Sequence, residues 1–200
     1  MQEGPQTGSP IPPETASIPP LRRELRSWTR DLAILLGLAI VVMVFLYQPV
    51  KVEGTSMYPL LSDQERIFIN KFVYRFEPIE RGDVVVFWYP LDRQKSFIKR
   101  VVGLPGEMVE IRTGHVYIDG RELADQYVPA GYLDGSNLAA RRIPADCYFV
   151  MGDHRDSSND SRMFGPVQRQ FIYGKAVFAY WPVDHFGSLS PTSTVNAASK

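Results

Sequence analysis

The chain has 200 residues, which suits one globular domain with additional segments. Its 22 basic and 22 acidic residues give zero net charge, so there is no electrostatic basis for binding nucleic acid. Cys147 is the only cysteine, which excludes an intrachain disulfide and a paired-cysteine metal site, and the three histidines are far apart in the sequence. We therefore expect no metal and no other cofactor.

The composition of the N-terminal quarter predicts a tail followed by a membrane anchor. Residues 1–20 contain six prolines, and this composition predicts a disordered tail because it buries too little apolar surface to offset the entropy of ordering. Residues 21–31 form a basic segment with four arginines, and residues 32–50 contain no charge. As a helix, residues 32–50 would span about 28 Å, close to the roughly 30 Å of a bilayer core, and they predict a transmembrane anchor.

Two other interpretations of the apolar run are weaker. A buried helix of a soluble domain rarely lacks every charge over this length. A cleaved signal peptide needs a small-x-small site, whereas this run ends in Phe-Leu-Tyr-Gln-Pro at residues 45–49. Four arginines precede the run and only Lys51 follows it closely, so the positive-inside rule predicts a cytoplasmic N-terminus and an extracytoplasmic domain at 51–186.

The rest of the chain is typical of β-structure. Runs of β-branched and aromatic residues predict strands at 66–71, 83–89, 97–102, 109–111, 115–118, 147–151 and 172–181. Thr113-Gly114 and Asp119-Gly120 predict tight turns. We expect a mainly β fold, an antiparallel sandwich or barrel-like structure, with residues 103–145 as a candidate second β lobe and residues 187–200 as a flexible tail.

Three stretches contain residues that could perform chemistry. Ser56 lies just beyond the anchor in Gly-Thr-Ser-Met-Tyr-Pro (residues 54–59), and Lys99 lies in Ser-Phe-Ile-Lys-Arg-Val-Val-Gly (residues 96–103). The third stretch is Gly-Asp-His-Arg-Asp-Ser-Ser-Asn-Asp-Ser-Arg (residues 152–162). Taken singly, the serine is better explained as a surface hydroxyl and the lysine as a strand-edge residue with its amine in water, and the third stretch also fits a solvated polar turn.

A serine hydroxyl needs a base to become a good nucleophile. The chain has no Gly-x-Ser-x-Gly elbow, and His154 is the only histidine in a motif-like stretch, so a histidine-based triad is hard to build. Lysine can replace histidine if its pKa falls from about 10.4 towards neutrality, which burial among apolar side chains achieves. On a strand, Phe97, Lys99 and Val101 would share one face and Arg100 would point the other way.

Together the three stretches resemble the conserved boxes of bacterial type I signal peptidase, a membrane-anchored Ser–Lys protease, and the resemblance extends over residues 50–182. It implies Ser56 as the nucleophile and Lys99 as the general base. It also implies that Ser158 orients the lysine amine. Asp153, Asp160 and Arg162 would support this loop.

The resemblance also implies an oxyanion hole and substrate pockets. The oxyanion hole would use the Ser56 N–H and position 54, where Gly54 lacks the hydroxyl that many family members have. The shallow pockets for small side chains would be formed by Val50, Val52, Met57, Leu61, Phe97 and Ile98.

The implied substrates are signal-peptide-bearing preproteins, cut after small-x-small sites. The implied surroundings are the lipid bilayer of the bacterial cytoplasmic membrane, spanned once, and the neighbourhood of the secretion translocon. Two related peptidases are alternatives: a LexA-like self-cleaving regulator, whose DNA-binding N-terminus is missing here, and a protease that processes conjugative pilin. A non-catalytic, membrane-tethered β-domain is the alternative from another class.

Overall fold

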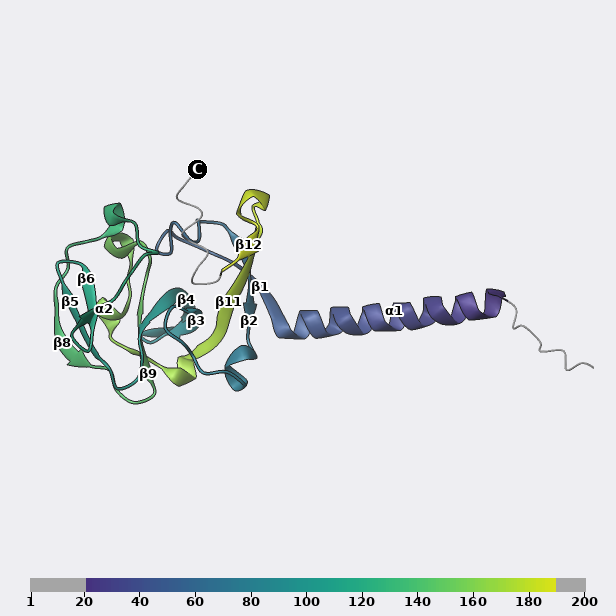
Figure 1. Ribbon diagram of the computed structural model, residues 1–200, viewed down its shortest axis with the longest axis horizontal. Helices are drawn as coiled ribbons and strands as arrows, with labels where there is room; N and C mark the ends of the chain where they lie inside the picture. The colour runs from purple at the N-terminus through teal and green to yellow at the C-terminus, as the bar shows by residue number, and fades with distance from the viewer. Residues whose placement is uncertain (1–20, 190–200) are drawn as a thin grey trace, which may run out of the picture. The chain divides into compact units, whose positions relative to one another are not determined.

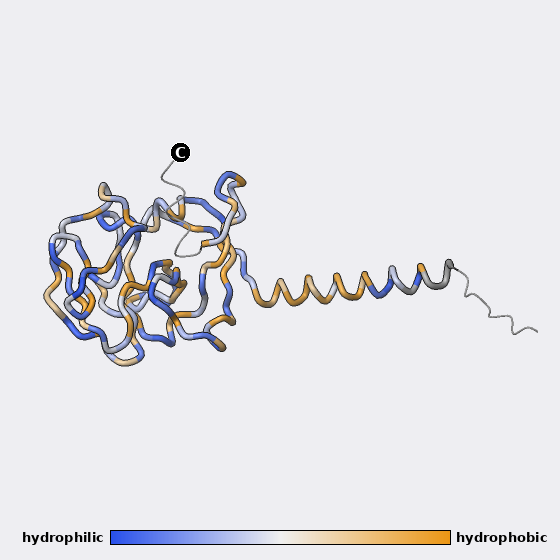
Figure 2. The backbone as a smooth tube through the Cα atoms, in the orientation of Figure 1, coloured by the Kyte–Doolittle hydropathy of each residue, from blue (hydrophilic) through white to orange (hydrophobic). Residues whose placement is uncertain are grey.

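The computed structural model of the protein describes residues 21–189, so the predicted tail at 1–20 and residues 190–200 lie outside the described part. The chain divides after Val42 into two compact units. Helix α1 (Leu21–Leu46) contains one stretch, Trp28–Leu46, that is long and apolar enough to cross a membrane, and Figure 2 shows most of it in orange.

The predicted anchor end at Val50 is wrong, because the helix stops at Leu46 and Tyr47–Lys51 form strand β1. Pro49 lies within this strand. Proline cannot continue a helix and disfavours the helical conformation of the residue before it. It is tolerated in β1 because β1 is the edge strand of its sheet.

Two antiparallel sheets form the unit that begins at Met43 (Figure 1). The larger has the order β1-β2-β11-β3-β4-β9-β10, with β12 beside β11, and the smaller has the order β7-β6-β5-β8. The remaining strands of the larger sheet are β2 (Arg66–Asn70), β3 (Val84–Tyr89), β4 (Asp92–Gly103), β9 (Cys147–Met151), β10 (Val167–Gln168), β11 (Ile172–Trp181) and β12 (Gly187–Ser188). Both sheets are open, so the predicted antiparallel β architecture is confirmed, without closure into a barrel.

The smaller sheet lies within residues 103–145, where the sequence predicts a second lobe. Its strands are β5 (Met108–Arg112), β6 (His115–Ile118), β7 (Arg121–Glu122) and β8 (Leu138–Arg142). Short helical segments complete the fold: α2 (Ser161–Phe164), η1 (Val73–Arg75), η2 (Ala130–Tyr132), η3 (Arg155–Ser157), η4 (Arg169–Phe171) and η5 (Val183–His185).

Turn chemistry explains the hairpins of the smaller sheet. Thr113 and Gly114 have φ of 46° and 85°, and Asp119 and Gly120 have φ of 50° and 78°. Paired positive φ values are what a two-residue hairpin turn requires, and glycine accepts them at no steric cost. The turns predicted at both places are therefore confirmed.

The larger sheet is buried on both faces around β3. Val84 and Val86 belong to the core beneath the 52–65 loop, whereas Val85 and Phe87 belong to the core on the opposite face. Because side chains alternate along a strand, a strand between two cores needs apolar residues at every position. A third core joins the smaller sheet to β4 and β9.

The predicted flexible tail at 187–200 is wrong for its first three residues. Gly187 and Ser188 pair with β11, and the N–H of Leu189 donates to the carbonyl of Val177 at 3.0 Å. Leu189 is buried in the core beneath the 52–65 loop, so burial of its side chain holds this segment against the sheet.

A buried ion pair connects β4 to the segment after β9. The Arg100 guanidinium donates to both carboxylate oxygens of Asp153, from Nε at 2.8 Å and from Nη2 at 2.6 Å, and both side chains are fully buried. Arg100 Nη1 donates to the carbonyl of Gly82 at 3.0 Å. The bidentate geometry compensates for the cost of removing both charges from water.

We predict that Asp153→Asn lowers the free energy of unfolding by about 3–5 kcal/mol, because it leaves the Arg100 guanidinium buried without a counter-charge. Chemical denaturation of the full chain in detergent measures this. The matched control is Asp92→Asn, whose partner Lys95 lies 3.2 Å away on the surface, and it should change stability by less than about 1 kcal/mol. Equal effects of the two substitutions would contradict the importance of the buried pair.

Candidate active site

Ser56 lies in the loop that joins β1 to β2. Backbone hydrogen bonds close the base of this loop, from Val52 N–H to Glu65 at 2.8 Å and from Gln64 N–H to Val52 at 2.9 Å. The N–H of His154 donates to the carbonyl of Ser56 at 3.1 Å. The loop is therefore held both at its base and at the serine.

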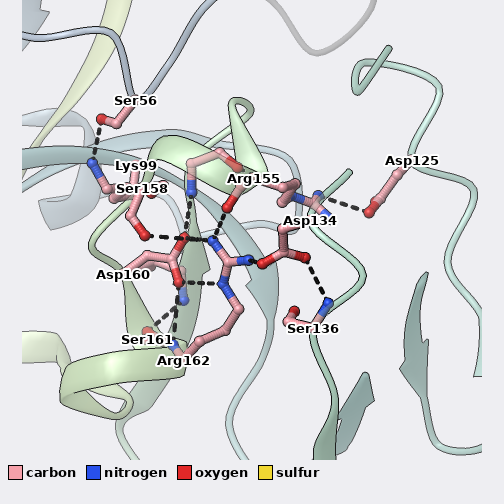
Figure 3. Close-up of polar contacts among 12 residues, drawn as sticks. Ser56, Lys99, Asp125, Asp134, Ser136, Arg155, Ser158, Asp160, Ser161 and Arg162 are labelled. Atoms are coloured by element: carbon pink, nitrogen blue, oxygen red, sulfur yellow. Dashed lines mark hydrogen bonds and ion pairs between the residues drawn. The ribbon is translucent and has the colours of Figure 1, made fainter. Parts of the chain in front are cut away.

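Strand β4 brings Lys99 to Ser56. Lys99 Nζ lies 2.6 Å from Ser56 Oγ and donates to the carbonyl of Ile98 at 3.0 Å. The side chain is only 4% exposed, and Nζ lies 5.4 Å from the centre of the Phe97 ring. The predicted strand thus places an amine, largely shielded from water, in hydrogen-bond contact with the serine hydroxyl (Figure 3).

Burial lowers the pKa of Lys99 from 10.5 to about 8, because the charged ammonium loses hydration. The carboxylates of Asp160 and Asp153 act in the opposite direction and raise this pKa. Each of them is paired with an arginine: Asp153 with Arg100, and Asp160 with Arg162 at 2.7 Å. The arginines compensate the nearby negative charges, which leaves the effect of burial dominant.

A cavity of about 550 Å³ opens beside Ser56. Its walls are residues 50–53, residues 95–99 of β4, Ser56, Val86, Asn159 and Tyr173. Of the six predicted pocket residues, the cavity is lined by Val50, Val52, Phe97 and Ile98. Among residues 21–189, no group of three His, Cys, Asp or Glu side chains could hold a metal ion.

Met57 and Leu61 do not line this cavity. Their side chains are 1% and 0% exposed and pack in the core under the 52–65 loop. The turn after Ser56 directs them inward, with the N–H of Leu61 donating to the carbonyl of Met57 at 2.9 Å. Their contribution is to hold the loop rather than to contact a ligand.

Ser158 Oγ lies near the Ser56 loop, since a Cβ on Gly152 would overlap both this oxygen and the Ser56 carbonyl oxygen, but the hydroxyl makes no hydrogen bond to the Lys99 amine. Ser158 Oγ is buried and has no hydrogen-bond partner within the described part of the chain. The expected orienting contact to Lys99 is therefore missing from this structure, where the carbonyl of Ile98 holds the amine instead.

The expected role of position 54 in an oxyanion hole also meets an obstacle. The N–H of Gly54 donates to Asp63 Oδ1 at 2.8 Å and is not free for another acceptor. Gly54 has a φ of 90°, a conformation that favours glycine. The N–H of Ser56 makes no hydrogen bond to any of residues 21–189, so it can accept a new partner.

The site contains residues that the sequence analysis did not identify. Arg155 is buried and pairs with Asp125 at 2.7 Å, and Arg162 pairs with Asp134 as well as Asp160 (Figure 3). Asn159 and Tyr173 line the cavity. Arg162 is expected from the sequence to support this loop, but nothing in the sequence indicates that Asp125 and Asp134, 30 and 28 residues before their arginines, would be partners.

Gly152 is a further contributor. A Cβ at this position would overlap both Ser158 Oγ and the carbonyl oxygen of Ser56. Glycine is therefore required so that the Ser56 loop and the 152–162 segment can approach each other. Its signal in the sequence is its place at the start of the Gly-Asp-His-Arg stretch.

A family model and curated relatives identify one family. A family model described as signal peptidase, peptidase S26, matches residues 25–181. A signal peptidase I from Leptolyngbya laminosa is 35% identical and covers 94% of this chain and 96% of that protein. One from Bacillus amyloliquefaciens is 36% identical, covering 78% and 84%. A crystal structure of a signal peptidase I from Enterococcus faecalis is 30% identical, covering 50% of this chain and 97% of that chain, with a TM-score of 0.44.

We expect Gly152→Ala to slow the reaction of Ser56 with a serine-directed boronate probe by about a hundredfold, because displacing the Ser56 loop by about 1 Å spoils its alignment with Lys99. The rate of probe binding by the full chain in detergent measures this. Gly187→Ala is the control, since a Cβ there meets nothing within 4 Å. Unchanged probe reactivity in Gly152→Ala would show that the close approach is not needed.

Proposed function

Because the chain belongs to the signal peptidase family of S26 peptidases, we propose that it removes signal peptides from exported preproteins with Ser56 as nucleophile and Lys99 as general base. The observation that carries this proposal is the 2.6 Å contact between Lys99 Nζ and Ser56 Oγ, made by an amine that burial holds at a pKa of about 8. A lysine can act as the general base near neutral pH only with a lowered pKa and in contact with the hydroxyl, because only a neutral amine can accept the serine proton.

In the acylation step, neutral Lys99 takes the proton of Ser56 as Oγ bonds to the scissile carbonyl carbon. The N–H of Ser56 donates to the developing oxyanion, and such a donor is typically worth about 10²–10³ in rate. The ammonium of Lys99 then gives its proton to the leaving amine as the C–N bond breaks. This releases the mature protein and leaves the signal peptide as an ester on Ser56.

In the deacylation step, Lys99 is neutral again and takes a proton from a water molecule that attacks the ester. The proton then passes to Ser56 Oγ as the ester bond breaks. Ser158 Oγ is buried near the Ser56 loop and has no partner among the described residues, and in our proposal it forms the hydrogen bond that orients the Lys99 amine when substrate draws Ser56 Oγ away. Ion pairs of Asp153, Asp160 and Arg162 hold the 152–162 segment that contains Ser158 and balance its charge.

The cavity accommodates the residues before the cut. β1 is an edge strand, so an extended segment can pair with the backbone of residues 50–53 and pass along residues 96–99 of β4. Alternate side chains of an extended segment face the same way. The side chain before the scissile bond and the one two positions earlier would therefore contact Val52, Phe97 and Ile98 in the cavity wall. This contact favours small residues at both positions.

Membrane anchoring follows from α1. Ser56 is ten residues from Leu46, so at about 3.3–3.6 Å per residue it lies within about 36 Å of the helix end. The arginines before the apolar stretch support our proposal of a cytoplasmic N-terminus with the sheets outside, by the positive-inside rule. A site this close to the end of the membrane helix would meet signal peptides as they emerge beside the secretion translocon.

The test is incubation of the purified full chain in detergent with a signal-peptide-bearing precursor, followed by mapping of the new N-terminus. We expect one cut after a small-x-small sequence. A phenylalanine just before the cut should lower kcat/KM by about tenfold or more, because overpacking an apolar site costs about 1–3 kcal/mol. Efficient cleavage after phenylalanine would contradict the assignment of the pocket. No cleavage of any precursor would favour a non-catalytic tethered domain.

The roles of Ser56 and Lys99, here called the dyad, are tested separately. Ser56→Ala and Lys99→Ala should each abolish precursor cleavage, and Lys99→Arg should fail too because a guanidinium stays charged and cannot accept the proton. The matched controls are Ser188→Ala and Lys71→Arg, at exposed positions away from the cavity, and both should cleave at the rate of the unsubstituted chain. Full activity in Lys99→Arg would refute the lysine base.

The lowered pKa of Lys99 also sets the pH dependence. The active form is the neutral amine, so kcat/KM should increase about tenfold per pH unit below pH 8 and level off above it. About one tenth of the sites would be active at pH 7. Initial rates from pH 6 to 10 at constant ionic strength, with addition of a chelator as a control that changes nothing, measure this. A rate that is flat or falling between pH 6 and 8 would contradict the proposed base.

A further inference from the structure

The connection between β7 and β8 reaches the active site from the smaller sheet. Within it, residues 125–134, here called the 125–134 loop, contain the turn η2 and include Tyr127 and Tyr132. Nothing in the proposed chemistry uses this loop. Its contacts nevertheless lead to all three arginines that surround the dyad.

Contacts with Arg155, Arg100 and Arg162 fasten the 125–134 loop. Asp125 pairs with buried Arg155 at 2.7 Å and accepts from the Tyr127 hydroxyl at 2.7 Å, and the Tyr127 ring lies 4.2 Å from the guanidinium carbon of Arg100. At the other end, Asp134 pairs with Arg162 (Figure 3). A loop held at both ends by charge-assisted bonds presents its middle residues in a fixed position.

The fixed position places Tyr132 beside the nucleophile loop. The ring of Tyr132 lies 5.7 Å from that of Tyr58 and 4.4 Å from that of His154, both nearly edge-on. His154 is joined to the nucleophile loop, since its N–H donates to the carbonyl of Ser56 and its Nδ1 lies 3.2 Å from the carbonyl of Thr55. Tyr58, Tyr132 and His154 therefore form one aromatic cluster beside Ser56.

The cluster lies apart from the cavity that would hold the signal peptide. None of its three residues lines that cavity, whose walls include Ser56 but nothing further along the 52–65 loop. Tyr58 is 40% exposed, and Tyr132 and His154 are partly exposed. Tyr58 follows Ser56 by two residues, and the N–H of His154 donates to the Ser56 carbonyl, so a chain that leaves the cavity past Ser56 can continue over these rings.

We propose that the cluster of Tyr58, Tyr132 and His154 binds the first residues of the mature chain, just after the scissile bond. This inference rests on the proposed function of the same site. Tyrosine rings provide apolar contact area at low conformational cost, which suits an extended peptide with an apolar or aromatic side chain. The smaller sheet thereby contributes to specificity through a loop that it delivers to the site.

The experiment uses the full chain in detergent and two precursor peptides with the same signal segment. The short peptide ends in an amide one residue after the cut. The extended peptide continues for five residues after the cut, and the second of these is leucine. The measured quantity is the ratio of kcat/KM for the extended peptide to that for the short one. We expect a ratio of about ten, which truncation of the Tyr132 ring in Tyr132→Ala brings close to one.

Two further variants separate binding from a general structural effect. Tyr132→Phe keeps the ring and should keep the ratio of kcat/KM values. Tyr117→Ala removes a tyrosine of the smaller sheet that stacks on Arg112, and it should also leave this ratio unchanged. A ratio near one in the unsubstituted chain, or the same ratio in Tyr132→Ala, would overturn the inference. If the unsubstituted chain cut neither peptide, the proposed function itself would fail, and the two failures are thereby distinguished.

Discussion

The site depends on one constraint, which is that an amine must be kept out of water while two carboxylates lie close to it. Burial lowers the pKa of Lys99, whereas Asp153 and Asp160 raise it. Arg100 and Arg162 pair with these carboxylates and balance their charge. Consecutive residues of β4 serve both needs, because alternation along the strand sends Lys99 towards Ser56 and Arg100 towards Asp153.

The rest of the site is built by bringing separate loops to this strand. The 52–65 loop delivers Ser56 and buries Met57 and Leu61 beneath it, so that the core holds the nucleophile in place. The 152–162 segment reaches the same loop because Gly152 has no side chain to prevent the approach. Asp125 and Asp134 then attach the smaller sheet to this segment. A loop of the smaller sheet is thus part of the surroundings of the dyad.

The same arrangement suits an extended substrate. The edge strand β1 and residues 95–99 of β4 border the cavity beside Ser56, and the aromatic cluster lies next to the Ser56 loop outside this cavity. Backbone pairing at an edge gives affinity with little demand on sequence, while a few side-chain positions give selectivity. This division fits our proposal that many different preproteins are cut at small-x-small sites.

The elements that depend on local order could be predicted from the amino-acid sequence. Alternating and continuous apolar runs predicted the central strands, the Thr-Gly and Asp-Gly pairs predicted both hairpin turns, and motif resemblance led to Ser56 and Lys99, which the structure brings to 2.6 Å. Only the tertiary structure decided that the helix ends at Leu46, that the Gly54 N–H is taken by Asp63, that Ser158 Oγ has no partner among the described residues, and that Arg155 and Arg162 bind Asp125 and Asp134. These features result from contacts between residues far apart in the chain or from pairing with a neighbouring strand, and neither local propensity nor the spacing of a motif contains that information.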